Sequence, residues 1–225
     1  EYKINGLFMI NCGWHGNYYN SASQKMFLER SKLNQCAADE LGIPMYLIDS
    51  NFHAFTYTIL RGVNDKMGYI AMYSCVIALQ SAIKKYYVAS SFTYGETIRY
   101  GQMKRNSNFD AFATPYAVHL ASTEKISFII DGCQKKRCEK LETISDWEIA
   151  QKYLNVCIGD AHIFHKDSEN ISGNENPYNC SKCEKCLRTQ IVLEGLGKQK
   201  NFAKVFDAEI YKQHSFLYKC YIVAK

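Results

Sequence analysis

Three cysteines at two-residue intervals are the residues of this chain whose types and spacing most clearly indicate chemistry. Cys180, Cys183 and Cys186 stand in the sequence Asn-Cys-Ser-Lys-Cys-Glu-Lys-Cys-Leu-Arg of residues 179–188. Thiolates spaced in this way converge on one point when the backbone turns tightly, and a metal ion is the usual reason for such convergence. A closed tetrahedral site needs a fourth ligand, and Cys157 is the nearest cysteine upstream. The alternative fourth ligands are His162, His165 and His214.

The spacing indicates a metal but leaves its kind open. Structural zinc is favoured, because four thiolates around a turn supply its tetrahedral geometry and Lys182, Lys185 and Arg188 would offset their negative charge. An iron–sulfur cluster is the alternative, since three close cysteines and one distant cysteine also hold such clusters. A four-thiolate zinc site has no open position for water, so we expect it to anchor the chain rather than to catalyse.

The elements that must position this site alternate between strand-like and helix-like runs. Short apolar runs predict buried strands over 4–12, 45–49, 86–90 and 126–131. Longer apolar or amphipathic runs predict helices over about 24–41, 66–84 and 138–153. Ser21 or Ser23 would cap the first helix and Gly42 would end it. The polar residues 97–115 predict an irregular, mobile surface loop.

This alternation predicts an α/β fold with a mostly parallel sheet and helices on both of its faces. Ligands bind such sheets at the carboxyl ends of the strands, which here are Cys12, Asp49, Ser90 and Asp131. A break near residues 154–157 would divide the chain. We expect an α/β domain over residues 1–154 and a cysteine-rich, helical subdomain over residues 155–225 that the metal stabilises.

Five residues could contact a nucleotide at this sheet. Ser90 and Ser91 follow the third strand and offer two hydroxyl groups, while Gly68 near the start of the second helix allows close backbone approach of a ligand. Arg137 and Lys140 begin the helix after the fourth strand and could neutralise phosphate oxygens. Each also fits an ordinary structural role as a loop start, a helix break or a solvated charge.

Composition narrows the compartment and the partners. The chain has 225 residues, of which 47% are apolar, and a formal net charge of +5, which is too small to indicate nucleic acid and mildly favours anionic ligands. Several of the ten cysteines lie in apolar segments, as buried thiols of reducing compartments do. With no signal peptide and no apolar run of membrane-spanning length, we expect a cytoplasmic protein. The histidines interpreted as structural or surface residues are His15, His53 and His119.

Taken in order, these features resemble a known family. They are the Ser-Ser-Phe-Thr-Tyr loop of residues 90–94, Arg137 with Lys140, then Cys157 and the cysteine turn followed by Leu-Arg-Thr. This order resembles the 7-cyano-7-deazaguanine synthase family of the PP-loop ATP pyrophosphatases, and looks more like its divergent members than the queuosine-pathway enzyme. The resemblance covers residues 4–197. The cysteine motif is specific, whereas the sheet motifs are informative only in this order.

The resemblance implies a fold and an activity. The fold would be Rossmann-like, of the adenine nucleotide alpha hydrolase-like kind, with ATP and Mg²⁺ as substrate at the carboxyl ends of the strands. A small carboxylic acid would be activated as an acyl-adenylate with release of pyrophosphate, and ammonia or an amine would then displace AMP. The four cysteines, Cys157 included, would hold zinc, Lys140 would contact phosphate, and the Ser90 loop would face the nucleotide or the acid.

The sequence departs from the family at one point. The family's pyrophosphate loop has the form Ser-Gly-Gly-x-Asp-Ser and follows a strand that precedes the equivalent of residues 4–12, and these 225 residues contain no such sequence. We expect that strand and loop to precede Glu1 in a longer chain, and their loss is the alternative. Two other functions stay open. One is a degenerate nucleotide-binding module whose zinc-anchored face binds a protein partner, and the other is a tRNA-modifying enzyme of the same superfamily with an iron–sulfur cluster.

Overall fold

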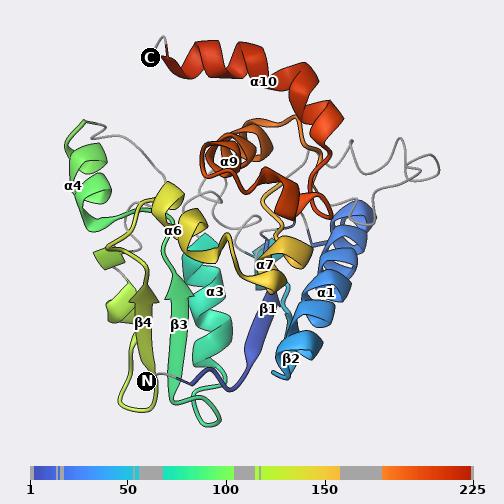
Figure 1. The fold of residues 1–225 in the computed structure, drawn as a ribbon. Coiled ribbons are helices and arrows are strands. Elements are labelled where there is room, and N and C mark those ends of the chain that lie inside the picture. The colour runs from blue at the N-terminus through green and yellow to red at the C-terminus, as the bar shows by residue number, and fades with distance from the viewer. Residues whose placement is uncertain are drawn as a thin grey trace. The chain divides into compact units, whose positions relative to one another are not determined.

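The computed structural model is a mixed α/β structure (Figure 1). It describes residues 3–13, 15, 18–52, 54–55, 68–103, 115–116, 118–157 and 179–223. The chain forms two compact units. The first consists of Glu1–Ser31 and Ile43–Arg137, and the second of Lys32–Gly42 and Cys138–Lys225. The units and the domains expected from the sequence divide the chain at different points, and the boundary after residue 154 stays a prediction.

Four short strands lie in the first unit as two parallel pairs. β1 (Leu7–Asn11) pairs with β2 (Met45–Asp49), and β3 (Lys85–Ala89) pairs with β4 (Ser127–Asp131). The parallel arrangement agrees with the sequence pattern, since consecutive strands are joined by long crossovers rather than hairpins. The sequence predicted a single sheet, whereas the described strands form two separate two-stranded sheets. β1 and β3 do not pair with each other, and a pocket lies between them.

The helix α1 (Ser21–Leu41) begins earlier than expected because Asn20 caps it. The Asn20 Oδ1 accepts hydrogen bonds from the backbone N–H groups of Ala22 at 2.8 Å and Ser23 at 3.4 Å, so the expected caps at Ser21 and Ser23 were wrong. Gly42 follows the helix with a φ of 64°, the left-handed conformation that commonly ends helices. The helix passes from the first unit into the second.

Two further helices of the first unit differ from the sequence expectation. α3 (Gly68–Ile77) ends before the expected boundary at residue 84, because residues 78–82 continue as turns. α4 (Tyr94–Met103) covers residues 97–103, which were expected to be irregular. Its first turn is a capping box: the Thr93 N–H donates to Glu96 Oε2 at 2.8 Å, and the Glu96 N–H donates to Thr93 Oγ1 at 3.1 Å.

One face of both strand pairs shares a core with α3. The rings of Tyr73 on α3 and Phe128 on β4 meet edge to face, with centroids 5.3 Å apart. The short 3₁₀ helix η2 (Val118–Ala121) closes this core beside β4. The buried members of the cluster are Ile10, Cys12, Ala71, Tyr73, Val76, Val88, Val118, Ile126 and Phe128.

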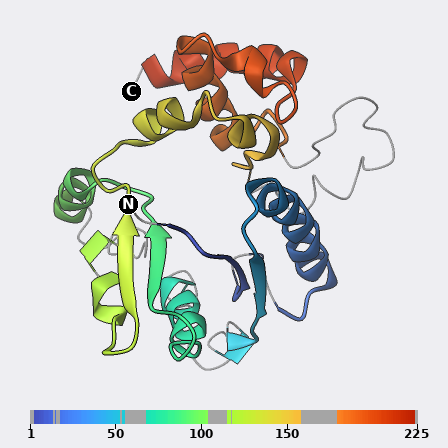
Figure 2. The ribbon, with the colours of Figure 1, turned by 60° about the horizontal axis from the view of Figure 1, so that its bottom comes forward.

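The second unit is helical. It contains α6 (Arg137–Ile144) from its second residue on, α7 (Glu148–Tyr153), α9 (Glu184–Gly195), the 3₁₀ helix η3 (Gln199–Phe202) and α10 (Ala208–Val223). α10 packs against α9 (Figure 2). The single helix expected over 138–153 is broken between α6 and α7, where the Ser145 side chain and N–H both bond to the Glu142 carbonyl. Among the helices in the described residues, none has the length and apolarity needed to cross a membrane.

Candidate metal centre

The metal centre is built on the turn that leads into α9. Ser181 has a φ of 56°, a left-handed conformation that bends the chain between Cys180 and Cys183. Cys183 is the N-cap residue of α9, and Cys186 lies in its first turn. The Cys183 N–H donates to the Cys180 sulfur at 3.3 Å. A backbone donor aimed at sulfur and the positive end of a helix both favour thiolates, so this turn is suited to cysteine ligands.

Asn179 brings the distant fourth cysteine to the turn. Its side-chain oxygen accepts hydrogen bonds from the N–H groups of Val156 at 3.0 Å and Cys157 at 3.2 Å. Its side-chain nitrogen donates to the carbonyl of Leu154 at 2.7 Å. Three hydrogen bonds from one buried amide therefore hold the segment 154–157 against the residue that precedes Cys180.

The four sulfur atoms lie at the separations of a tetrahedral site. All ligand atoms of Cys157, Cys180, Cys183 and Cys186 are within 4.8 Å of one another. Measured pairs are Cys157–Cys180 at 3.5 Å, Cys157–Cys183 at 3.8 Å and Cys180–Cys186 at 3.9 Å. A metal with four sulfurs at about 2.3 Å places them roughly 3.8 Å apart. All ten cysteines of the chain are free, so none of the four is held in a disulfide. The donor set and its spacing fit one metal ion such as zinc.

Burial and hydrogen bonds between the thiols define the electrostatics of the cluster. Cys157 and Cys186 are buried, and Cys180 and Cys183 are half-buried within the core of the second unit. Hydrogen bonding with the Cys157 and Cys186 thiols lowers the pKa of Cys180. The hydrogen bond to Cys180 raises the pKa of Cys157 to about 11, and the hydrogen bond with Cys157 also raises the pKa of Cys186. Thiols bind a metal as thiolates, so metal binding at this cluster would release protons.

Two supporting residues fix the turn itself. The Ser181 hydroxyl accepts the N–H of Asp207 at 2.8 Å, and the Ser181 carbonyl accepts from the side chain of Gln190 at 3.1 Å. Gln190 is fully buried and also donates to the carbonyl of Cys186 at 3.3 Å. No role in the site was predicted from the sequence for Asn179 or Gln190.

Of the three histidines considered as the fourth ligand, the structure describes His214. His214 lies exposed on α10 and is not a member of the cluster of ligand atoms. His162 and His165 lie outside the described residues. Among the candidates that the structure describes, Cys157 is therefore the one that joins the cysteine turn.

Three of the five expected nucleotide contacts lie near one another in the first unit. Ser90 follows β3, and its N–H donates to the carbonyl of Asp131 at the end of β4, at 2.9 Å. The Ser91 hydroxyl lies 3.4 Å from the hydroxyl of Tyr69, which is adjacent to Gly68 at the amino end of α3. The carboxyl ends of β3 and β4 therefore lie close to the first turn of α3.

The other two expected contacts lie on α6. Arg137 is its first residue and belongs to the first unit, while Lys140 belongs to the second. Arg137 is exposed and Lys140 is half-buried. Their contact with phosphate stays a prediction.

A polar network that was not predicted from the sequence lies at the carboxyl ends of β1 and β2. The buried Asn11 side chain donates to Asp49 Oδ1 at 2.8 Å and to Gln24 Oε1 at 3.2 Å. The Tyr18 hydroxyl donates to Asp49 Oδ2 at 3.4 Å, and the negative charge of Asp49 raises the pKa of Tyr18. These contacts tie the loop after β1 to the end of β2.

No protein-family model, curated protein or solved structure matched the chain. The four cysteines are therefore interpreted from their own geometry, as a cluster that could bind a metal such as zinc.

Proposed function

We propose that the four cysteines hold one structural zinc ion. The cluster supplies four sulfur ligands at tetrahedral separations, which leaves no coordination position for water or substrate. It lies among the core residues Leu193, Phe202 and Val205 of the second unit. An ion placed there would tie the segment around Cys157 to the start of α9. Its role is then to stabilise the fold, and any chemistry belongs elsewhere.

The activity that we propose is that of an ATP-dependent carbon–nitrogen ligase similar to 7-cyano-7-deazaguanine synthases. The observation that carries it is the convergence of Cys157 on the cysteine turn, which is the ligand set that the resemblance implies. The parallel strand pairs, with Ser91 beside the start of α3, support a Rossmann-like fold with ATP at the carboxyl ends of the strands.

The reaction would proceed in two balanced steps. A carboxylate oxygen of a small acid attacks the α-phosphorus of ATP, and Mg²⁺-bound pyrophosphate leaves. The nitrogen of ammonia or an amine then attacks the acyl carbon, loses a proton, and AMP leaves with the bonding electron pair. Lys140 would neutralise phosphate charge, and the hydroxyl groups of Ser90 and Ser91 would bind the nucleotide or the acid.

Pyrophosphate release tests the activity. The full-length gene product is incubated with ATP, Mg²⁺, ammonia and a panel of small carboxylic acids, and pyrophosphate and AMP are measured. We expect equal amounts of both with at least one acid. Lys140→Ala should reduce the rate at least tenfold, whereas the exposed Lys200→Ala on η3 should not. A zinc-loaded protein that releases no pyrophosphate with any acid would instead be a non-catalytic module, which could bind a protein partner.

Elemental analysis tests the metal. We expect about one zinc per chain and a colourless protein. Cys157→Ser should lose the metal, and Cys220→Ser, on the exposed face of α10, should keep it. A brown protein that contains iron and absorbs visible light would mean that the cysteines hold an iron–sulfur cluster instead of zinc. That result would favour the tRNA-modifying enzyme.

A further inference from the structure

The outer edge of β2, on the side away from β1, is an open strand edge. Among the described strands, β2 pairs with β1 alone. The Pro44 carbonyl accepts the N–H of Leu7, and the Ser50 N–H donates to the carbonyl of Asn11. The polar groups of successive strand residues alternate between the two edges of a strand. The even-numbered residues of this segment therefore bond to β1, and the odd-numbered residues point outward.

Three residues of β2 turn their backbone groups outward, and these are Met45, Leu47 and Asp49. Within the described residues, no hydrogen bond takes up these outward groups. Soluble proteins usually guard such an edge with a lysine, a bulge or a covering segment. The one charged residue of β2 is Asp49, whose carboxylate bonds to Asn11 and Tyr18 of its own chain. The middle of the edge is therefore uncharged and able to bind another strand.

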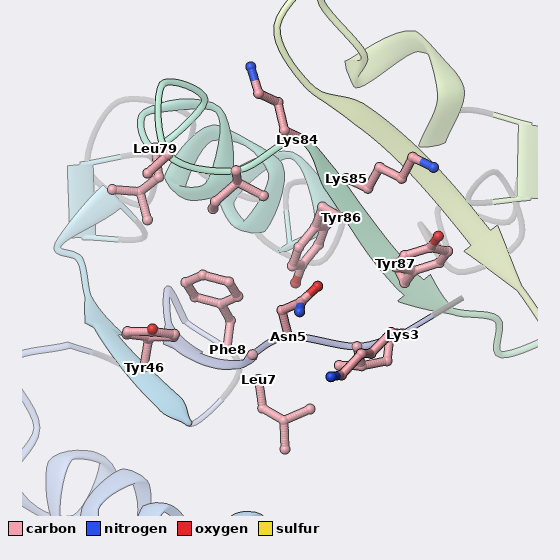
Figure 3. A pocket seen from close by; sticks show the side chains of 14 residues that line it. Lys3, Asn5, Leu7, Phe8, Tyr46, Leu79, Lys84, Lys85, Tyr86 and Tyr87 are labelled. Carbon is pink, nitrogen blue, oxygen red and sulfur yellow. The ribbon is translucent and has the colours of Figure 1, made fainter. Parts of the chain in front are cut away.

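Apolar side chains border this edge on both faces. Leu47 is 50% exposed and Tyr46 is 51% exposed. Leu47 lies on the face that α1 covers, since the sulfur of its register partner Met9 accepts from the Ser31 hydroxyl at 3.4 Å. Tyr46 lies on the other face, where its ring stacks on that of Phe8 with centroids 5.4 Å apart (Figure 3). A strand added at this edge would cover apolar surface as well as backbone groups.

The helix α1 adds a further exposed apolar side chain beside Leu47. Leu28 is 54% exposed. It stands one turn after Gln24 and one turn before Ser31, which both contact β1, so it lies on the side of α1 that adjoins the strands. A right-handed crossover, the usual hand of a parallel connection, turns this flank of α1 toward the outer side of β2.

We propose that the outer edge of β2 pairs with the same edge of a second copy of this chain. The two strands run antiparallel about a two-fold axis at Leu47. Leu47 then faces the partner's Leu47, and Met45 faces the partner's Asp49. Facing residues of this kind exchange two N–H···O bonds, so every outward backbone group of Met45, Leu47 and Asp49 is satisfied. The result is one sheet that continues from copy to copy, in the order β1, β2, β2, β1.

The symmetry and charge of the edge favour a second copy over another peptide. The three outward residues are centred on Leu47, so the edge is complementary to itself, as a two-fold interface requires. On the other face, Tyr46 comes opposite the partner's Ile48, an aromatic and β-branched pair of the kind that stabilises sheets. The Asp49 carboxylates of the two copies lie at opposite ends of the added ladder, so like charges do not meet. The proposal depends neither on the metal nor on ATP.

Sedimentation equilibrium of the full-length protein tests the proposal, in the absence of ATP. We expect twice the mass of one chain. Leu47→Lys should raise the dissociation constant of the dimer at least about tenfold, because two ammonium groups would face each other across the axis. Leu120→Lys, at an exposed position of η2 in the same unit, is the matched control and should leave the dissociation constant unchanged. Neither result depends on the proposed activity.

A disulfide tests the register and does not require the lysine variant to fold. Facing residues that exchange two hydrogen bonds have Cα atoms about 5.5 Å apart, which a disulfide can span. Oxidised glutathione should therefore link two chains of Leu47→Cys, as measured by non-reducing electrophoresis. Leu120→Cys and the unmodified protein are the controls, and both should stay mostly unlinked. The second control accounts for the natural exposed thiols, which are those of Cys36, Cys138 and Cys220.

Three results would overturn the proposal. One is a monomer at protein concentrations of about 100 µM, the range in which a weak dimer still forms. Another is a dimer whose dissociation constant is the same with Leu47→Lys as with Leu120→Lys, because the copies would then meet at another surface. The third is a dimer in which Leu47→Cys forms no link beyond that of the controls, because the two strands would then lack the two-fold register at Leu47.

Discussion

Asn179 contributes three hydrogen bonds to the segment that carries Cys157, and the sulfur of Cys157 is the ligand farthest along the chain from the turn. We predict that Asn179→Ala weakens zinc binding by about 10- to 100-fold, the usual effect of removing a residue that orients a ligand. Competition with a chromophoric chelator measures the affinity. Asn201→Ala, at an exposed position of η3, is the matched control and should bind as the unmodified protein does. Equal affinity in both variants would mean that Cys157 is held by other contacts.

His15 supplies a prediction about pH. Burial, with a smaller contribution from the positive charge of Arg30, lowers its pKa from 6.5 to about 4, and its ring meets that of Phe27 edge to face. The unfolded chain therefore binds a proton near pH 6.5 that the folded chain accepts only near pH 4. Folding stability must fall as the pH drops through this interval and rise as the pH increases through it.

Substitution of His15 isolates this effect. We predict that His15→Phe removes about 1 to 2 kcal/mol of the stability difference between pH 7 and pH 4.5, allowing for the partial exposure of the ring. Urea unfolding at both pH values measures it. The two proteins are compared by how their free energy of unfolding changes with pH, so a change in stability that is the same at both pH values does not affect the result. Parallel stability profiles of the two proteins would show that His15 ionises freely in the fold.

The cysteines could be predicted from the sequence because a metal site leaves a local pattern, three thiols at two-residue spacing. Asn179 and Gln190 could not, since their partners are backbone groups whose positions depend on the folded chain: Asn179 binds the segment near Cys157, and Gln190 binds the carbonyl of Ser181. A side chain whose purpose is to hold a distant backbone segment has no signature in the sequence around it.

Secondary-structure elements show where local signals were present and overlooked. Thr93 and Glu96 have the spacing of a capping box, and they start α4 in a stretch that its polar composition had marked as a loop. The break between α6 and α7 depends instead on Ser145, whose hydroxyl and N–H both bond to the Glu142 carbonyl. The start of α4 was therefore predictable from its cap, whereas a serine bonded to a carbonyl one turn back also occurs inside helices and does not by itself predict a break.

Asp207 caps α10 and also connects that helix to the metal turn. Its side chain accepts the N–H groups of Glu209 at 2.8 Å and Ile210 at 3.0 Å, and its own N–H donates to Ser181. We predict that Asp207→Ala lowers the free energy of unfolding by about 1 kcal/mol, the usual effect of losing an N-cap. Urea denaturation in zinc-containing buffer measures the change.

The control for this helix cap is Asp146→Ala. Asp146 pairs with Lys198 at the surface, and an exposed pair contributes less than about 0.5 kcal/mol in most cases. If both variants lose the same stability, the Asp207 side chain acts as an ordinary surface charge. If neither variant loses stability, water replaces the hydrogen bonds of the Asp207 side chain at no cost in free energy of unfolding.

At the scale of the whole molecule, strand positions could be predicted but strand pairing could not. The run at 45–49 forms β2 at the expected residues, and the runs at 86–90 and 126–131 form β3 and β4 within one residue. Pairing depends on which segments lie side by side, and apolar runs carry no record of their neighbours. The separation of β1 from β3 is therefore a property that only the structure reveals.

The division into two units leads to a prediction about metal removal. The cysteine cluster lies wholly in the second unit and packs with Leu193, Phe202 and Phe206 of its core. The first unit has its own core, centred on Phe128 and Val76. Because binding of a structural metal is coupled to folding, loss of the ion should affect the second unit selectively.

We predict that a strong chelator, or Cys183→Ser, abolishes hydrogen-exchange protection in α9 and α10 while α3 and β3 keep theirs. Peptide-level exchange with mass spectrometry measures both units in one experiment. Cys220→Ser, an exposed thiol outside the cluster, should retain zinc and protection throughout. If α9 stayed protected without metal, the packing of Leu193 and Phe202 would suffice to fold the second unit. If α3 lost protection together with α9, the two units would unfold as one, and the cluster would support the whole chain rather than its own half.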